Sequence, residues 1–166
     1  IQLTDVAGAT SAWSAGTNTF VLASGGGGDT GFKTAGAIKT STGWSNFTTT
    51  RLGTSDNSRA SCNSTCDNTD NGQVGNFAFV IPAGATINGI EVVAEMNEAA
   101  STGNIGTQLS LSWNNGTNFT SVKSATVDGT TDINYTLGGP ADTWGRTWTD
   151  AELADSVFRL KLDKVA

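Results

Sequence analysis

Apolar residues recur at every second position on both sides of one turn signal, and this pattern limits the fold more than any other feature of the chain. The alternating residues are Phe77, Phe79 and Ile81 before the turn, and Ile90, Val92, Ala94 and Met96 after it. A period of two places one set of side chains on a buried sheet face and the other set outward. Pro82 and Gly84 separate the two runs and interrupt strands. We therefore predict two strands joined by a turn at residues 82–86, with Glu91, Val93 and Glu95 facing outward.

Other segments repeat the β pattern. Strands or extended segments are expected at 17–23, 31–40, 43–52, 107–113, 119–127, 132–138 and 157–162. Residues 107–113 place Leu109, Leu111 and Trp113 on one face, and the following Asn114-Asn115-Gly116 predicts a tight hairpin into residues 119–127.

A different signal lies in residues 148–156, where Thr149 and Glu152 have the spacing of a capping box and predict one short helical turn. Many short strands with almost no helix indicate an all-β chain. We predict a two-sheet antiparallel β-sandwich, jelly-roll-like, with one short helical turn near the C-terminus. A length of 166 residues fits a single domain over residues 1–166.

The charge balance excludes some partners. Only 14% of residues are charged, the net charge is -6, and no Lys or Arg occurs between Arg59 and Lys123. Nucleic-acid binding uses clustered Lys and Arg, so no nucleic-acid partner is expected. No apolar run approaches the roughly 20 residues that span a bilayer, so no membrane span is expected either.

The first residue and the cysteines indicate the setting. Ile1 is not an initiator Met, which indicates a processed precursor and an extracellular, cell-surface or virion-surface location; a trimmed sequence is the alternative. In an oxidising setting, Cys62 and Cys66 are expected to form a small disulfide in a loop-like stretch. The chain has no His, so zinc is a poor alternative.

Metal binding and catalysis have weak signals. No cofactor is predicted, although Asp67 and Asp70 leave a simple calcium loop site open; Ala78 stands where an EF-hand needs its Glu. Without His, catalytic triads are excluded, and an acid pair such as Glu91 and Glu95 has the ordinary interpretation of solvated carboxylates on one strand face. We expect no enzyme activity.

Five sequons give weak support for a glycoprotein, because about three or four would arise by chance in a chain this rich in Asn, Ser and Thr. They lie at Asn46, Asn63, Asn115, Asn118 and Asn134.

An ordered set of stretches resembles a known type of module. "FAFVIPAGATINGIEV", "LSLSWNNGTNF" and "YTLGGPADTWGRTWTDAELADSVFRLKL", within roughly residues 44–162, are similar to a recurrent, mostly uncharacterised β-sandwich module of bacterial and phage surface or structural proteins. The resemblance implies an exposed, non-catalytic building block with the Pro82 turn at a corner between core strands. Trp144 and Trp148 near its end favour either closure of the core or stacking on sugar rings.

Two classes of function follow. In the first, the chain is a structural subunit of an extracellular surface assembly, such as a pilus-like filament, with itself as partner; a phage virion protein of tail or capsid is an alternative. In the second, it is a carbohydrate-binding module that recognises surface glycans. For self-assembly, residues 1–23 are the candidate connector, with Phe20 and Leu22 as buried anchors, unless this strand pairs within its own domain.

Overall fold

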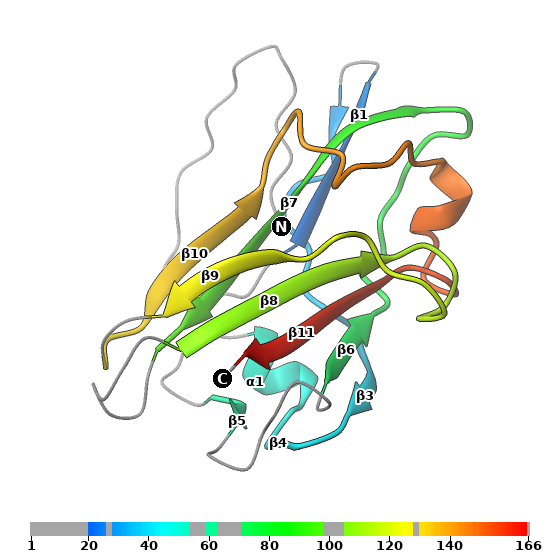
Figure 1. Ribbon diagram of the computed structural model, residues 1–166. Coiled ribbons are helices and arrows are strands. Elements are labelled where there is room, and N and C mark those ends of the chain that lie inside the picture. The colour runs from blue at the N-terminus through cyan, green and yellow to red at the C-terminus, as the bar shows by residue number, and fades with distance from the viewer. Residues whose placement is uncertain are drawn as a thin grey trace.

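The computed structural model describes residues 20–25, 28–53, 59–62, 71–97, 105–127 and 130–165. Within these ranges all the strands pair antiparallel, and the helical elements are α1 (Thr49–Gly53), a single turn of five residues, and the 3-10 turn η1 (Asp150–Leu153) (Figure 1). The predicted all-β class is confirmed.

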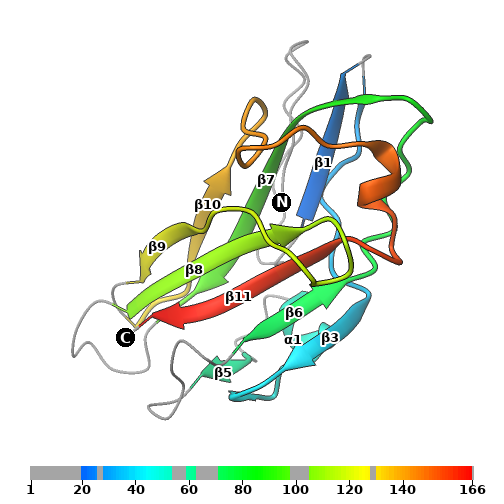
Figure 2. The same ribbon diagram turned by 45° about the vertical axis from the view of Figure 1, so that its right-hand side comes forward.

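Two larger sheets and one small one contain these strands. The four-stranded sheet has the order β10 (Ile133–Gly138), β7 (Thr86–Met96), β1 (Phe20–Gly25), β2 (Gly28–Asp29). The five-stranded sheet has the order β3 (Ala37–Ser41), β6 (Gly72–Gly75), β11 (Arg159–Val165), β8 (Ile105–Ser112), β9 (Lys123–Val127), most of which lie side by side in Figure 2. The small sheet pairs β4 (Trp44–Ser45) with β5 (Ser61–Cys62).

Side chains from both larger sheets meet in one hydrophobic core. Ile90 and Val92 of β7, Leu109 and Leu111 of β8, and Leu160 of β11 are all fully buried members of the same cluster. Burial of each such side chain contributes about 1.5–3 kcal/mol relative to exposure. The two sheets therefore stabilise each other, while the finer jelly-roll assignment stays a prediction.

The predicted strand at residues 77–81 is wrong. This segment joins no sheet, because Asn76 (φ 59°) and Ala78 (φ 52°) have left-handed backbone that breaks a strand. The segment still alternates between buried and exposed side chains, although it pairs with no strand: Phe77 is buried, whereas Val80 is 84% exposed. After the turn, β7 forms as predicted, but Val93 is only 4% exposed, so its expected solvent-facing position is also wrong.

The predicted tight hairpin is wrong in its connection, although β8 and β9 do pair antiparallel, with Leu109 opposite Lys123. Asn115 (φ 61°) and Gly116 (φ 81°) form the expected positive-φ turn, closed by the Thr117 amide bonding to the Asn114 carbonyl at 3.3 Å. The chain then continues through residues 118–122 before β9 begins, so the turn lies inside a longer loop.

The C-terminal predictions hold in outline. The Thr149 amide donates to Glu152 Oε2 at 2.9 Å, so the capping box starts η1 as its spacing predicted. In β11, Leu160 and Leu162 face the core, and Arg159 is also buried, with only 6% of its surface exposed.

The N-terminal third is only partly as predicted. Residues 31–40 contain all but the last residue of β3, but in residues 43–52 the strand β4 is followed by the helical turn α1. The strand expected at 17–23 appears as β1, which lies between β7 and β2 of its own chain, with Phe20 opposite Val92 and Leu22 opposite Ile90. Residues 1–19 of the candidate connector lie outside the described residues.

Candidate functional site

The segment that follows β10 passes directly over β7. Its Gly139 amide donates to the Ile90 carbonyl at 3.1 Å, and the Ile90 amide donates to the Asp142 carbonyl at 2.8 Å. A side chain on Gly89 would place its Cβ only 2.3 Å from the Gly139 carbonyl oxygen and 2.5 Å from the Pro140 carbonyl carbon. The crossing therefore requires glycine at position 89.

Trp144 secures this crossing. Its indole Nε1 donates to the Ile90 carbonyl at 2.7 Å, so that one oxygen accepts two hydrogen bonds. A Cβ on Gly138 (φ 82°) would lie 2.7 Å from Nε1 and 2.1 Å from the same oxygen, which excludes a side chain there. Trp144 itself has a φ of 55°, an uncommon value for a bulky residue, and its amide is held by Asp142 Oδ1 at 2.8 Å.

Lys123 connects the same segment to the other sheet. This first residue of β9 places Nζ 2.6 Å from Asp142 Oδ2 and 5.1 Å from the centroid of the Trp144 ring. Burial raises the pKa of Asp142, but hydrogen bonds from Lys123 and the Trp144 amide, with the lysine charge, outweigh it and hold the pKa below its ordinary value. The ion pair therefore ties β9 to the segment that crosses β7.

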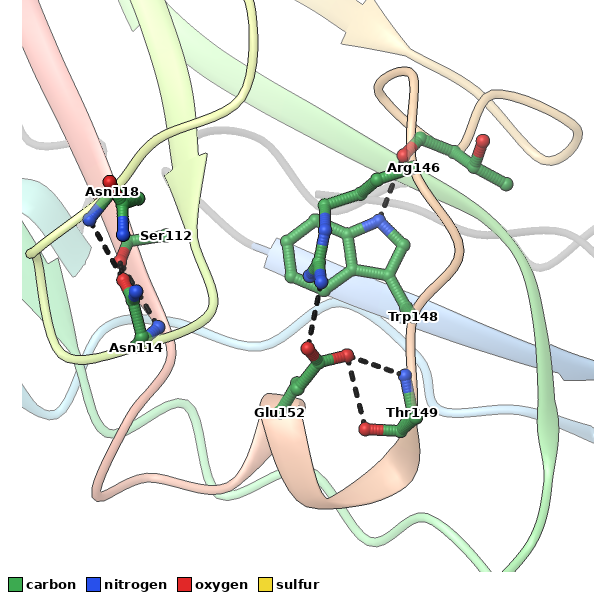
Figure 3. Close-up of polar contacts among 8 residues, drawn as sticks. Ser112, Asn114, Asn118, Arg146, Trp148, Thr149 and Glu152 are labelled. Atoms are coloured by element: carbon green, nitrogen blue, oxygen red, sulfur yellow. Dashed lines mark hydrogen bonds and ion pairs between the residues drawn. The ribbon is translucent and has the colours of Figure 1, made fainter.

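Arg146 forms a second set of contacts, between two tryptophans. Its guanidinium carbon lies 4.1 Å from the Trp113 ring centroid and 4.4 Å from that of Trp148, and its Nη2 is 2.7 Å from Glu152 Oε1. Figure 3 shows the Arg146 side chain lying across the Trp148 ring and reaching Glu152. The Trp148 indole donates to the Thr143 carbonyl at 2.8 Å. Cation–π contacts thus join the end of β8 to the start of η1.

Glu152 is held in its charged form by these neighbours. Burial raises its pKa, but Arg146 and the Thr149 amide and hydroxyl outweigh that effect, so the pKa lies below its ordinary value. We call the whole set the Trp–Arg latch, and its members are Trp113, Lys123, Asp142, Trp144, Arg146, Trp148 and Glu152.

The latch is suited to holding strands together. Trp144 and Trp148 are each 3% exposed, which confirms that they close the core and removes both as platforms for a sugar ring. Asp142 and Glu152 are bound to Lys123 and Arg146, respectively, so neither carboxylate is poised for proton transfer.

The other predicted site residues are scattered. Glu91 and Glu95 lie on one face of β7, partly buried, opposite Gly138 and Asn134. Of the sequon asparagines, Asn46, Asn115, Asn118 and Asn134 are exposed, whereas Asn63 lies outside the described residues, as do Asp67, Asp70 and Cys66. Cys62 lies in β5 opposite Trp44. In the part of the chain that is described, no three His, Cys, Asp or Glu residues gather as metal ligands.

A polar network around the β8–β9 loop was not predicted. The Ser112 hydroxyl accepts from the Gly116 amide at 2.9 Å. Asn114 Oδ1 accepts from the Asn118 amide at 2.8 Å, as Figure 3 shows. Arg159 donates to Asn115 Oδ1 and to the Phe158 carbonyl, the latter at 2.8 Å. Burial lowers the pKa of Arg159. Asn-rich turn spacing was visible in the sequence, but the arginine that binds it is far away along the chain.

Comparison with protein-family models, curated proteins and solved structures finds no match to this chain. Among the described residues, no helix combines the length and apolar character needed to cross a bilayer.

Gly89→Ala is expected to destabilise the fold by about 3 kcal/mol or more, because its Cβ would overlap backbone atoms of the crossing segment. Gly139→Ala is the matched control: a Cβ there meets nothing within 4 Å, so stability should change by less than about 1 kcal/mol. Urea unfolding measures both variants. Equal stabilities would contradict the crossing.

Arg146→Ala is expected to cost about 2–3 kcal/mol, through the loss of two cation–π contacts and an ion pair. Arg146→Lys keeps the charge but not the planar stacking surface, so it should fall in between. Arg51→Ala in α1 serves as the control, with an expected change within about 0.5 kcal/mol. If Arg146→Lys were as stable as the wild type, stacking would contribute nothing.

The free energy of unfolding should also decrease as the pH falls into the acid range. Because Asp142 and Glu152 have lowered pKa values in the folded state, their contribution is complete above the unfolded values of about 4 and is lost as pH falls through the folded ones. The variant Asp142→Asn/Glu152→Gln should lose stability at neutral pH and show a shallower decline between about pH 5 and pH 2. Asp150→Asn, which changes a carboxylate without an ion pair to any described residue, should keep the wild-type profile.

Proposed function

We propose that this chain is a non-enzymatic structural subunit of an extracellular surface assembly, such as a pilus-like filament. The observation that carries the proposal is the structural role of the chain's most distinctive residues. Gly89, Gly138, Trp144 and Trp148 belong to the resemblance described above, and all of them serve packing at the latch. A module whose unusual residues build rigidity is suited to bearing load or holding shape in an assembly.

The charge distribution supports the same proposal. The latch carboxylates are neutralised by Lys123 and Arg146, which leaves them unsuited to general acid–base work. With 14% charged residues, the chain is rich in hydroxyl and amide groups, which can form neutral surfaces on which copies pack despite the net charge of -6. A virion subunit would use the same properties, whereas a glycan-binding module would need aromatic faces other than Trp144 and Trp148.

The proposal keeps two covalent features of a secreted protein. A Cys62–Cys66 disulfide would covalently tie the end of the two-residue strand β5 to a residue four positions further along the chain. Exposed Asn46 and Asn118, which lie away from β10, are the sequons best placed to carry glycans without loss of contacts.

Intact mass of native material tests both features. We expect a mass lower than the reduced polypeptide by two hydrogens, after removal of any glycans with a glycosidase. Free thiols in native protein would contradict the disulfide. A native mass equal to the bare polypeptide would remove glycosylation from the proposal.

Electron microscopy of native material tests the assembly itself. Regular polymers that are labelled by an antibody against this chain are the expected result. Native protein that stays monomeric and is retained on polysaccharide would contradict the structural role and favour glycan recognition instead.

A further inference from the structure

The edge strands of the two larger sheets differ in how well they are protected from pairing. β3 carries the exposed Lys39 and an irregular register between Ile38 and Thr40, β2 has only two residues, and β9 begins with Lys123. Charges, bulges and shortness are the usual devices that keep sheet edges from joining. β10, at the other edge of the four-stranded sheet, has none of them.

β10 lies beside β7 at one edge of the four-stranded sheet (Figure 1), and this edge strand is regular and uncharged. Its six residues pair with β7 without any register shift, and they contain no Pro and no charged side chain. Ile133 is 46% exposed, and Asn134 and Thr136 are exposed. Such a strand is a template for another strand of similar character.

The ladder with β7 shows which backbone groups point outward. The Gly139 amide bonds to the Ile90 carbonyl, so alternation along the register directs the backbone groups of the odd-numbered residues 133, 135 and 137 toward β7. The N–H and C=O groups of Asn134 and Thr136 therefore point away from β7. Beyond the ladder with β7, no backbone hydrogen bond from the described residues reaches these outward groups.

The side chains of β10 make this edge self-complementary. If two copies pair antiparallel with Tyr135 on a twofold axis, Ile133 lies opposite Leu137 of the second copy. Asn134 then lies opposite the second copy's Thr136, and each such pair exchanges both of its N–H···O bonds, because the outward groups are those of residues 134 and 136. This register matches apolar with apolar and amide with hydroxyl.

Charge also favours a second copy as the partner. A chain with a net charge of -6 repels itself except where a surface is neutral. Residues 133–141 carry no charge, and the acidic residues at either end are paired, Asp132 with Arg59 at 3.3 Å and Asp142 with Lys123 at 2.6 Å. We infer that two copies of this chain associate through the outer edge of β10, antiparallel about a twofold axis.

The β10 contact specifies one way in which subunits of the proposed assembly would join. It rests on the proposed function only because it takes a second copy of this chain as the partner. The dimer joins two four-stranded sheets into one continuous sheet. In an assembly it would be one of the contacts, and a polymer needs at least one more.

Sedimentation equilibrium of the wild type and of Thr136→Pro tests the contact. Proline removes an outward N–H and leaves the ladder with β7 intact, so dimerisation should weaken roughly thirtyfold, about 1 kcal/mol for each of the two copies. Thr136→Ala keeps the N–H and should dimerise like the wild type. Far-ultraviolet circular dichroism verifies that each variant is folded.

Two lysine variants test the contact without relying on the folding of the proline variant. Thr136→Lys adds a charge to the β10 edge and should weaken the dimer, whereas Thr117→Lys, the same change at an exposed position of the β8–β9 loop, should not. A wild type that is monomeric up to about a millimolar overturns the inference. So does a dimer that none of the changes at position 136 weakens.

The outcomes separate this contact from the proposed function. Native polymers together with a monomeric purified chain would refute the β10 contact alone. A β10 dimer in native material that never forms polymers would refute the structural assembly alone.

Discussion

The carbonyl oxygen of Ile90 is the acceptor on which much of the arrangement depends. It receives the amide of Gly139 and the indole of Trp144, and through them it fixes where the chain crosses β7 after leaving β10. Gly89 and Gly138 leave the space for that double contact. A buried carbonyl with both lone pairs engaged is costly to expose, so the crossing resists local opening.

Two cationic side chains connect this crossing to other parts of the fold. Lys123 brings β9 to Asp142, and Arg146 brings the end of β8 to η1 through Trp113, Trp148 and Glu152. The five-stranded sheet is thereby tied to the segment that crosses the four-stranded one. Each ion pair alone contributes little, since surface pairs rarely exceed about 1 kcal/mol. Stacking on indole rings adds the packing that makes their geometry specific.

Much of the strand content could be predicted from the sequence, and the failures have physical reasons. β7, β10 and β11 follow from a period of two, and η1 from the Thr149–Glu152 spacing. Residues 77–81 have the same period, but positive φ at Asn76 and Ala78 is a tertiary outcome that no alternation predicts. Arg146 and Lys123 find their partners across long sequence separations, so spacing along the chain carries no signal of the latch. Trp144 and Trp148 were recognisable as a pair, and burial decides between their two roles.

The Trp144 indole N–H offers the most direct view of the central claim, that the crossing over β7 is part of the rigid core. Hydrogen exchange followed by NMR measures how often this bond to Ile90 opens. If the latch is integral to the fold, the indole exchanges only through global unfolding, with the same free energy as the amide of Val92 in β7. Exchange close to the rate of a free indole, while the Val92 amide stays protected, would contradict the account.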